Sequence, residues 1–140
     1  MFEVFDSHDA GYRPVRIGPV WQVSYLNYSR DFSAASTLER HRSTDTSFVL
    51  LEGCAQLLGY DADGSIEATP LKRGKLYLVP AGCWHAIQTN PGCRCLVIEN
   101  SNTHLCDVER KPRPEETQGL YRRVFRIINA SAADFGSGRC

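Results

Sequence analysis

The sequence has no long apolar run and no net charge, and each absence excludes a class of protein. No window approaches the 18 consecutive apolar residues of a transmembrane helix, so no membrane-spanning segment is expected. Sixteen Lys and Arg residues balance sixteen Asp and Glu residues in a chain of 140. Proteins that bind nucleic acids or anionic membranes carry a large positive excess. We therefore expect neither a nucleic-acid partner nor a membrane partner.

Cysteine is also scarce. Six cysteines in 140 residues are too few for a small disulfide-stabilised fold, and no Cys-x-x-Cys occurs. The first nine residues contain no basic cluster followed by an apolar run, so no secretory signal peptide is expected. These observations predict a cytoplasmic protein with reduced cysteines. Cys93 and Cys95 are the only close pair, and we expect their side chains to point to opposite faces of an extended segment.

Short runs typical of β-strands, separated by turn signals, recur between residues 15 and 100. Residues 21–25 alternate apolar and polar side chains, as in a half-buried strand, and residues 61–64 are typical of a hairpin turn. The other runs are 48–51, 55–60, 66–71, 76–79, 85–89 and 95–99. Strands at this spacing predict an all-β sandwich or barrel.

Two segments depart from the pattern. Residues 32–40 fit a short helix or an irregular connection. The chain becomes charged and proline-bearing near residue 107, so we predict a compact domain over 1–106 and a charged C-terminal extension over 107–140. Leu120, Val124 and Ile127 in the extension have helical spacing, although Val124 and its neighbours would also alternate as a strand. We favour a helix there, because its start, Pro-Glu-Glu, suits a first helical turn.

The most specific pattern in the chain lies between residues 74 and 89. Gly74, Pro80, Gly82 and His85 are separated by five, one and two residues, which suits a turn on each side of a short strand. His85 would then stand at the start of a strand and point into a barrel. The pattern resembles the second motif of the cupin superfamily, G-x5-P-x-G-x2-H-x3-N, with Thr89 in place of the asparagine.

A segment further upstream resembles the first cupin motif, H-x-H-x(3–4)-E-x6-G. With Gly53 as its glycine, His41 takes the place of the second histidine, Glu39 of the first histidine and Thr46 of the glutamate. The resemblance covers about residues 15–106. It implies an all-β double-stranded β-helix, or jelly-roll, barrel that holds a divalent metal in its mouth by three histidines and a glutamate.

Only His41 and His85 match the family's ligands residue by residue. Glu39 would supply a carboxylate in a histidine's place, whereas Asp45, beside Thr46, would reach the metal only from a locally bulged strand. The candidate metal ligands are therefore His41, His85, Glu39 and Asp45. Two histidines and a carboxylate would leave positions open for substrate or dioxygen, and the resemblance implies Zn, Mn, Fe or Ni.

Other side chains near the motifs suit either core packing or the wall of an apolar pocket. The candidate pocket residues are Thr46, Phe48, Tyr77, Trp84 and Thr89. His8 and His104 lie outside both motifs and are interpreted as solvated. Arg40 and Arg42 alternate with the motif residues and are expected to point outward.

Three functions remain open for such a barrel: a metal-dependent enzyme, a non-catalytic binder and a structural barrel used for oligomerisation. Thr46 and Thr89 depart from the family pattern and favour a binder over an enzyme. We predict a small-molecule-binding cupin barrel that can hold a divalent metal, with an anionic small molecule as its ligand. The alternative is a metal-dependent oxygenase, isomerase or lyase for a small oxygenated acid or sugar derivative. Pairing of apolar barrel edges in this superfamily implies a homodimer, and no catalytic residue or organic cofactor is assigned.

Overall fold

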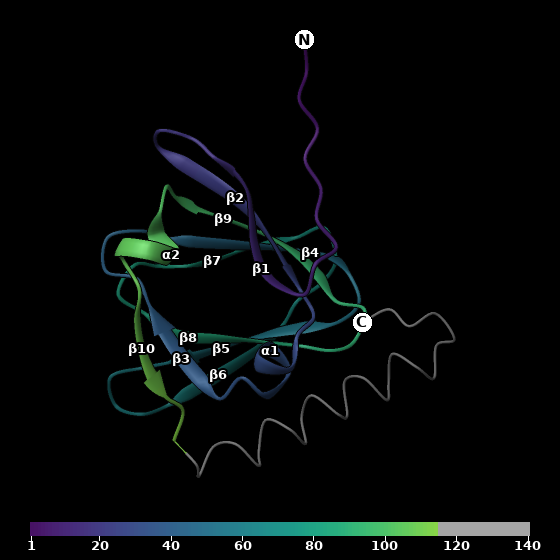
Figure 1. Cartoon of the computed structure of the whole chain (residues 1–140). Coiled ribbons are helices and arrows are strands. Elements are labelled where there is room, and N and C mark those ends of the chain that lie inside the picture. Colours follow the sequence, from purple (N-terminus) through teal and green to yellow (C-terminus); the bar gives the residue numbers. More distant parts are fainter. Residues whose placement is uncertain (115–140) are drawn as a thin grey trace.

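Two antiparallel sheets of five strands face each other in a computed structural model of the chain, which describes residues 1–114 (Figure 1). The first sheet has the order β1-β2-β9-β4-β7, and the second has the order β10-β3-β8-β5-β6. The strands of the first sheet are β1 (Gly11–Ile17), β2 (Trp21–Asn27), β9 (Arg94–Asn100), β4 (Thr46–Glu52) and β7 (Leu76–Val79). Those of the second are β10 (Glu109–Pro112), β3 (Thr37–Arg40), β8 (Trp84–Thr89), β5 (Ala55–Tyr60) and β6 (Ile66–Pro70).

The predicted all-β jelly-roll is confirmed. Sequence-distant strands lie side by side in each sheet, as β2 and β9 do in the first and β3 and β8 in the second. The segment 32–40, left open between helix and irregular connection, contains both the end of α1 (Arg30–Ala34) and all of β3. A second short helix, α2 (Thr103–Cys106), follows β9. Within the described part of the chain, no helix has the length and apolar character needed to cross a membrane.

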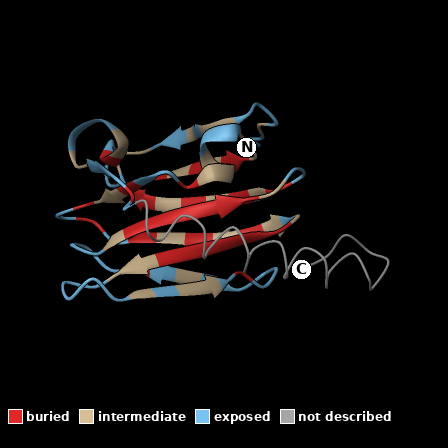
Figure 2. Cartoon of the chain, turned by 90° about the horizontal axis from the view of Figure 1, so that it is seen from below, coloured by how far each residue is buried: buried red, intermediate tan, exposed pale blue. Residues whose placement is uncertain are grey.

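The main hydrophobic core lies between the sheets, where the inner strands are buried (Figure 2). Its fully buried members include Leu50 of β4, Cys95 and Val97 of β9, and Leu71. A second cluster gathers Leu38, Leu58 and Ala86 with two further alanines and aromatic neighbours on the second sheet. The two clusters stabilise the sheets from which the site residues project.

Strand β2 confirms the predicted alternation but faces the interior with its polar side chains. Gln22 and Ser24 are fully buried, whereas Trp21 is 54% exposed. Gln22 is tolerated inside because its side chain hydrogen-bonds to groups from three other segments, described below. Trp21, Val23 and Tyr25 lie instead on the outer face of the first sheet, whereas Leu26, at the end of β2, is buried in the main core.

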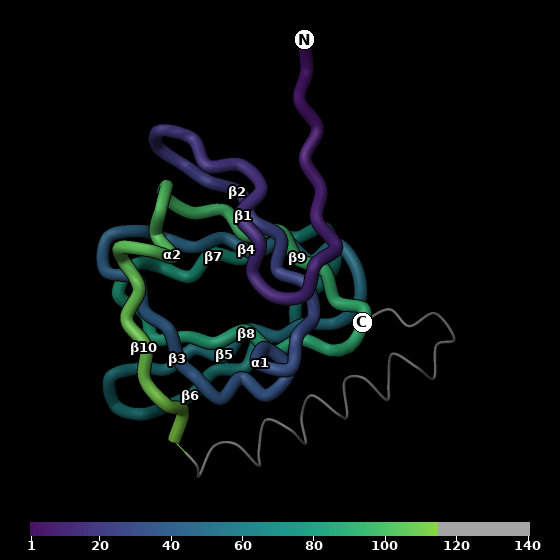
Figure 3. The backbone as a smooth tube through the Cα atoms, viewed as in Figure 1, coloured from purple at the N-terminus to yellow at the C-terminus, as the bar shows by residue number. Residues whose placement is uncertain are grey.

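The described chain continues the second sheet beyond residue 106. Strand β10 pairs with β3 in the register Glu109–Arg40 to Pro112–Thr37, so part of the predicted extension is an edge strand of the barrel. Figure 3 traces β10 along β3 and shows the N-terminal segment leading away from the barrel. The predicted helix around Leu120 to Ile127 lies outside the described residues.

The expected orientation of Cys93 and Cys95 was wrong. Both side chains are buried, and their Sγ atoms are 3.7 Å apart, because residues two positions apart in an extended chain share a face. The thiols of Cys83, Cys93, Cys95 and Cys106 are free. The hydrogen bond between the two buried sulfurs, followed by burial, raises the pKa of Cys95 far above its ordinary value, so this thiol stays protonated.

Candidate metal and small-molecule site

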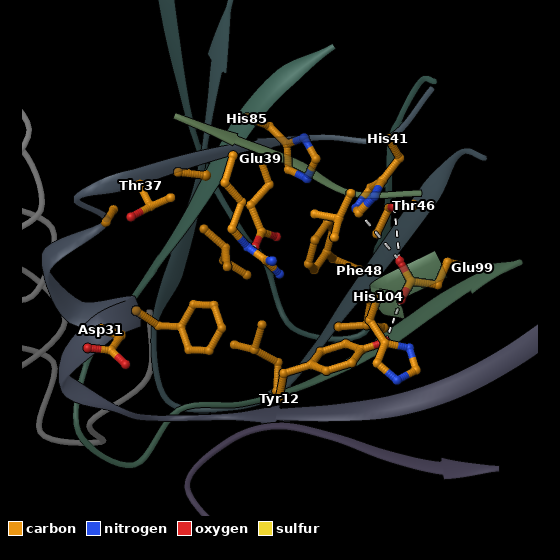
Figure 4. A pocket seen from close by; sticks show the side chains of 18 of the residues that line it. Tyr12, Asp31, Thr37, Glu39, His41, Thr46, Phe48, His85, Glu99 and His104 are labelled. Carbon is orange, nitrogen blue, oxygen red and sulfur yellow. Dashed lines mark hydrogen bonds and ion pairs between the residues drawn. The ribbon is translucent and has the colours of Figure 1, made fainter. Parts of the chain in front are cut away.

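A cavity of about 360 Å³ lies between the two sheets and is closed in part by α1 and α2 (Figure 4). Its apolar wall comes from both sheets: Leu26, Phe48, Val97, Ala86 and Ile87. Its polar groups include Glu39, His41, Thr46, His85, Glu99 and His104. An apolar cavity with a few convergent polar groups is the usual form of a small-molecule site.

His41 and His85 lie next to each other on the wall of this cavity (Figure 4). Their ring centroids are 5.6 Å apart. His41 follows β3, and His85 is the second residue of β8. The backbone N–H of Gly82 donates to the carbonyl oxygen of His41 at 2.7 Å, and Gly82 has a φ of +86°, which favours glycine. The turn of the second motif therefore fixes the histidine of the first.

Both imidazoles are oriented by backbone carbonyls. The Nδ1 atom of His41 lies 2.8 Å from the carbonyl oxygen of Asp107, and that of His85 lies 3.1 Å from the carbonyl oxygen of Cys83. A carbonyl only accepts, so each Nδ1 carries a proton, and a ring in its neutral form keeps its lone pair on Nε2. Histidine ligands of metals are usually held in this way.

Burial keeps His85 neutral. The side chain is buried beside Phe48, with ring centroids 6.4 Å apart in an edge-on arrangement. Desolvation lowers the pKa of His85 below its ordinary value of 6.5, and the neighbouring His41 lowers it further. A neutral imidazole is the form that binds a metal ion.

A buried carboxylate, Glu99, completes the polar side of the cavity. Its Oε2 atom lies 3.9 Å from Nε2 of His41 and accepts a 3.3 Å hydrogen bond from the hydroxyl of Thr46. Its Oε1 atom accepts from the hydroxyl of Tyr12 and, at 3.0 Å, from Nε2 of Gln22. Burial and then the hydrogen bond to Glu99 raise the pKa of Tyr12 well above 10, so its hydroxyl stays a donor.

Gln22 and His104 extend this network. Oε1 of Gln22 accepts from the backbone N–H of Asn102 at 2.7 Å, which leaves Nε2 as the donor to the cavity. Nε2 of Gln22 lies 2.9 Å from the hydroxyl of Tyr12 and 3.0 Å from Nδ1 of His104. The His104 ring lies against Tyr12, with centroids 5.6 Å apart. The interpretation of His104 as solvated was wrong, because α2 brings it to the cavity, whereas His8 is exposed as expected.

Glu39 lies on the opposite wall. It is the Cα partner of His85 across β3 and β8, and its Oε1 atom accepts a 2.8 Å hydrogen bond from Nε of Arg110 on β10. The side chains of Glu39 and Arg110 both line the cavity. Arg40 and Arg42 point away from it, as expected, and both pair with Glu109.

Several candidate residues lie elsewhere. Asp45 is exposed, and its Oδ1 atom accepts from the backbone N–H of Ala81 at 2.8 Å. Trp84 lies beneath Arg40 and Lys111 on the outside of the second sheet. Tyr77 packs at the main core and Thr89 is buried at the far end of β8, so neither lines the cavity. Of the candidates, the cavity brings together His41, His85, Glu39, Thr46 and Phe48.

The sequence analysis missed Tyr12, Gln22 and Glu99. A signal was present for Glu99, because it shares a strand face with Cys95 and Val97, and a carboxylate on a buried face is rare unless it has a partner. Residues 95–98 are all apolar, so the sequence did not indicate which face of this strand points inward. Residues 1–114 contain no preformed cluster of three or more His, Cys, Asp or Glu side chains close enough to hold a metal ion.

The architecture matches known structures, although no family model and no curated protein matches the sequence. A cupin-2 domain protein from Shewanella frigidimarina is 20% identical with a TM-score of 0.52, over 68% of this chain and 84% of that one. The protein has a cupin fold. KdgF from Halomonas sp. matches the fold with a TM-score of 0.54 and 14% identity, over 71% of this chain and 89% of that one.

A third cupin neighbour is the iron(II) form of HppE. It is 16% identical with a TM-score of 0.51, over 64% of this chain and 48% of that one. The structures with this fold thus include a cupin-2 domain protein and a protein described with iron(II). At these identities the likeness concerns the barrel, and the chemistry of the site follows from its own residues.

Proposed function

We propose that this cupin barrel binds a small anionic molecule in its cavity on a divalent metal held by His41 and His85. The observation that carries the proposal is the shared orientation of these histidines. Each donates its Nδ1–H to a backbone carbonyl and keeps the Nε2 lone pair in or beside the same cavity. HppE, which shares the fold and is described with iron(II), supports the presence of a metal in such a barrel.

The donor set fits a divalent metal. Two buried imidazoles are available, one of them kept neutral by burial, and carboxylates lie on two walls of the cavity. Imidazole and carboxylate ligands suit Zn, Mn, Fe and Ni. A metal bound here would act as a Lewis acid toward an oxygen of the small molecule. Glu39 is the carboxylate ligand that the first motif suggests, whereas exposed Asp45 would need a rearranged strand start.

Arg110 favours an anionic ligand. Its side chain lines the cavity and is 55% exposed, with Nε donating to Glu39. A carboxylate of the ligand would bind the guanidinium N–H groups of Arg110 that do not donate to Glu39. Arginine binds carboxylates through two parallel hydrogen bonds. The apolar wall would then hold the rest of a small ligand.

A metal-dependent enzyme for a small oxygenated acid or sugar derivative is the second candidate. Glu99 favours it, because a buried carboxylate beside His41 is placed to hold a proton near a bound ligand. An oxygenase, isomerase or lyase reaction would each use such a group. Catalytic turnover of small hydroxy acids or keto acids by the metal-loaded protein, lost in Glu99→Gln but with metal retained, would favour this candidate.

We also propose a homodimer that forms through the outer face of the first sheet. Trp21 of β2 and Leu76 and Leu78 of β7 are 54–60% exposed there. Strands β9 and β4 lie between them, and an exposed apolar face of a sheet is typical of an interaction surface. A cytoplasmic location stays a prediction from the first residues and the cysteine content.

Metal analysis tests the main proposal. The purified full chain is expected to carry close to one equivalent of a divalent metal after growth in metal-replete medium. The double variant His41→Ala/His85→Ala is expected to carry none. Added metal should raise the unfolding temperature of the parent only, because a ligand that binds the native state stabilises it. If the parent contained only traces of metal and its unfolding temperature did not change with Mn, Fe, Ni or Zn, metal binding at this site would be disproved.

A matched control uses the other histidines. The His8→Ala variant removes an exposed imidazole that pairs with Asp6 outside the cavity. It should retain the parent's metal content and its thermal shift. A loss of metal in this variant as large as in the double variant would contradict the assignment of His41 and His85.

A further inference from the structure

The first cupin motif lacks its carboxylate in this chain, because Thr46 stands at the glutamate position. A hydroxyl is a weak ligand compared with a carboxylate. Thr46 nevertheless lines the cavity and is 2% exposed. Its hydroxyl donates to a carboxylate oxygen of Glu99 at 3.3 Å, so a carboxylate does lie beside this position.

The register of the first sheet explains this proximity. Ser47 of β4 is the Cα partner of Ile98 of β9, and the strands are antiparallel. Thr46 and Glu99, one residue further along each strand, therefore face the cavity from adjacent positions (Figure 4). A side chain on β9 thus reaches the space that a longer side chain at position 46 on β4 would occupy.

Glu99 also lacks a fixed positive partner. It is 6% exposed, and within residues 1–114 no Lys or Arg forms an ion pair with it. Its partners are the hydroxyls of Tyr12 and Thr46, the amide of Gln22 and the ring of His41, 3.9 Å away. A buried carboxylate is costly unless a cation compensates it. A divalent metal on His41 would be that cation.

We propose that Glu99 is the carboxylate ligand of the metal, displaced by one strand from the motif position that Thr46 holds. This inference rests on the proposed function of the His41 and His85 pair. The Glu99 carboxylate lies 3.9 Å from Nε2 of His41 and accepts a hydrogen bond from Thr46, and on metal binding it would move from Thr46 toward His41. Tyr12 and Gln22 hold the other carboxylate oxygen and set its direction, as partners of ligating carboxylates do.

The test is a titration of metal-free full chain with Mn²⁺, followed by the loss of the EPR signal of the free ion. Mn²⁺ favours oxygen and imidazole ligands, so the exposed thiols of Cys83 and Cys106 interfere little. Glu99→Gln is expected to weaken binding by about 10–100-fold. Glu39→Gln, which removes the other cavity carboxylate, is expected to change it by less than about 3-fold.

The outcomes separate the two proposals. Loss of binding in His41→Ala with unchanged affinity in Glu99→Gln would overturn the role of Glu99 and keep the proposed function. A larger loss of Mn²⁺ affinity in Glu39→Gln than in Glu99→Gln would also overturn the role of Glu99. It would identify Glu39, at the position of the first motif histidine, as the carboxylate ligand. No binding by the parent would refute the proposed function itself.

An exchange variant distinguishes metal binding by Glu99 from a purely structural role of this residue. Thr46→Glu/Glu99→Thr returns the carboxylate to the motif strand and keeps the composition of the cavity. Recovery of Mn²⁺ affinity to within about 10-fold of the parent would support the displacement. Circular dichroism and thermal unfolding of each metal-free variant establish that it is folded. A folded Glu99→Gln protein with parental affinity overturns the proposal whatever the exchange variant does.

Discussion

The backbone N–H of Gly82 donates a 2.7 Å hydrogen bond to the carbonyl oxygen of His41, so the turn before β8 holds the residue after β3. One bond thereby joins the two segments that carry the histidines. The fold places the site at the junction of its two motifs, and stability and site geometry are coupled there.

We expect Gly53→Ala to destabilise the protein by about 3 kcal/mol. Gly53 has a φ of +71°, and an added Cβ would lie 2.7 Å from backbone atoms of Cys93. Gly59→Ala is the matched control, because a Cβ there meets nothing within 4 Å. Urea unfolding of both variants measures the difference. Equal stability of the two would contradict the close approach of the chain at Cys93.

The stability of the metal-free protein should rise with pH between about 5.5 and 7. The folded-state pKa of His85 is lowered below 6.5, so in this window the unfolded chain binds a proton that the folded protein does not. Stability is then lost as the pH falls, by at most about 1.4 kcal/mol per pH unit. Urea unfolding across the window should show a smaller slope for His85→Gln. The slope of His8→Gln, which alters an exposed ring, should equal the parent's.

Removal of the Tyr12 hydroxyl should destabilise the fold by about 1–3 kcal/mol, because it leaves the buried Glu99 carboxylate with one donor fewer. Tyr12→Phe tests this by thermal or urea unfolding. Tyr25→Phe is the control, because the ring of Tyr25 lies under Arg94 on the outer face and its hydroxyl has no hydrogen bond among the described residues. An equal effect of both changes would count against the Glu99 network.

Substitution of Leu76 and Leu78 by Glu should convert the proposed dimer to a monomer. Two carboxylates on the outer face of β7 would be buried without partners in an interface that uses this face. Light scattering coupled to size-exclusion chromatography measures the mass. Leu105→Glu, at a still more exposed leucine on α2, should leave the dimer intact. A parent that elutes as a monomer at high concentration would disprove the dimer.

Seven strands, β2 and β4 to β9, could be predicted from the sequence, whereas β1, β3 and β10 could not. Residues 55–60 and 76–79 have the predicted bounds, because apolar runs end there at Gly, Asp and Pro turn signals. Strands β1 and β10 are rich in Arg, Lys and Pro, and each lies at the edge of a sheet. Edge strands often carry charge and proline, which makes them look like loops in a sequence.

The site was predictable where a motif fixed the spacing. His41 and His85 follow from their offsets to Gly53 and Gly82, because turn glycines set the strand register. Glu99 and His104 have no such local pattern. Their place in the cavity depends on the pairing of β9 with β4 and on the position of α2, which only the assembled sheets determine.

The bond from Nδ1 of His41 to the carbonyl oxygen of Asp107 has a kinetic consequence. Asp107 precedes β10, an edge strand whose neighbour in the sheet is β3. Edge strands open locally with less free energy than the global unfolding of a domain. Fraying of β10 would release the His41 ring while the barrel stayed closed. The time for which His41 stays oriented for metal binding is then set by the local opening of β10. Slow hydrogen exchange of the β10 amides would accompany a long-lived site.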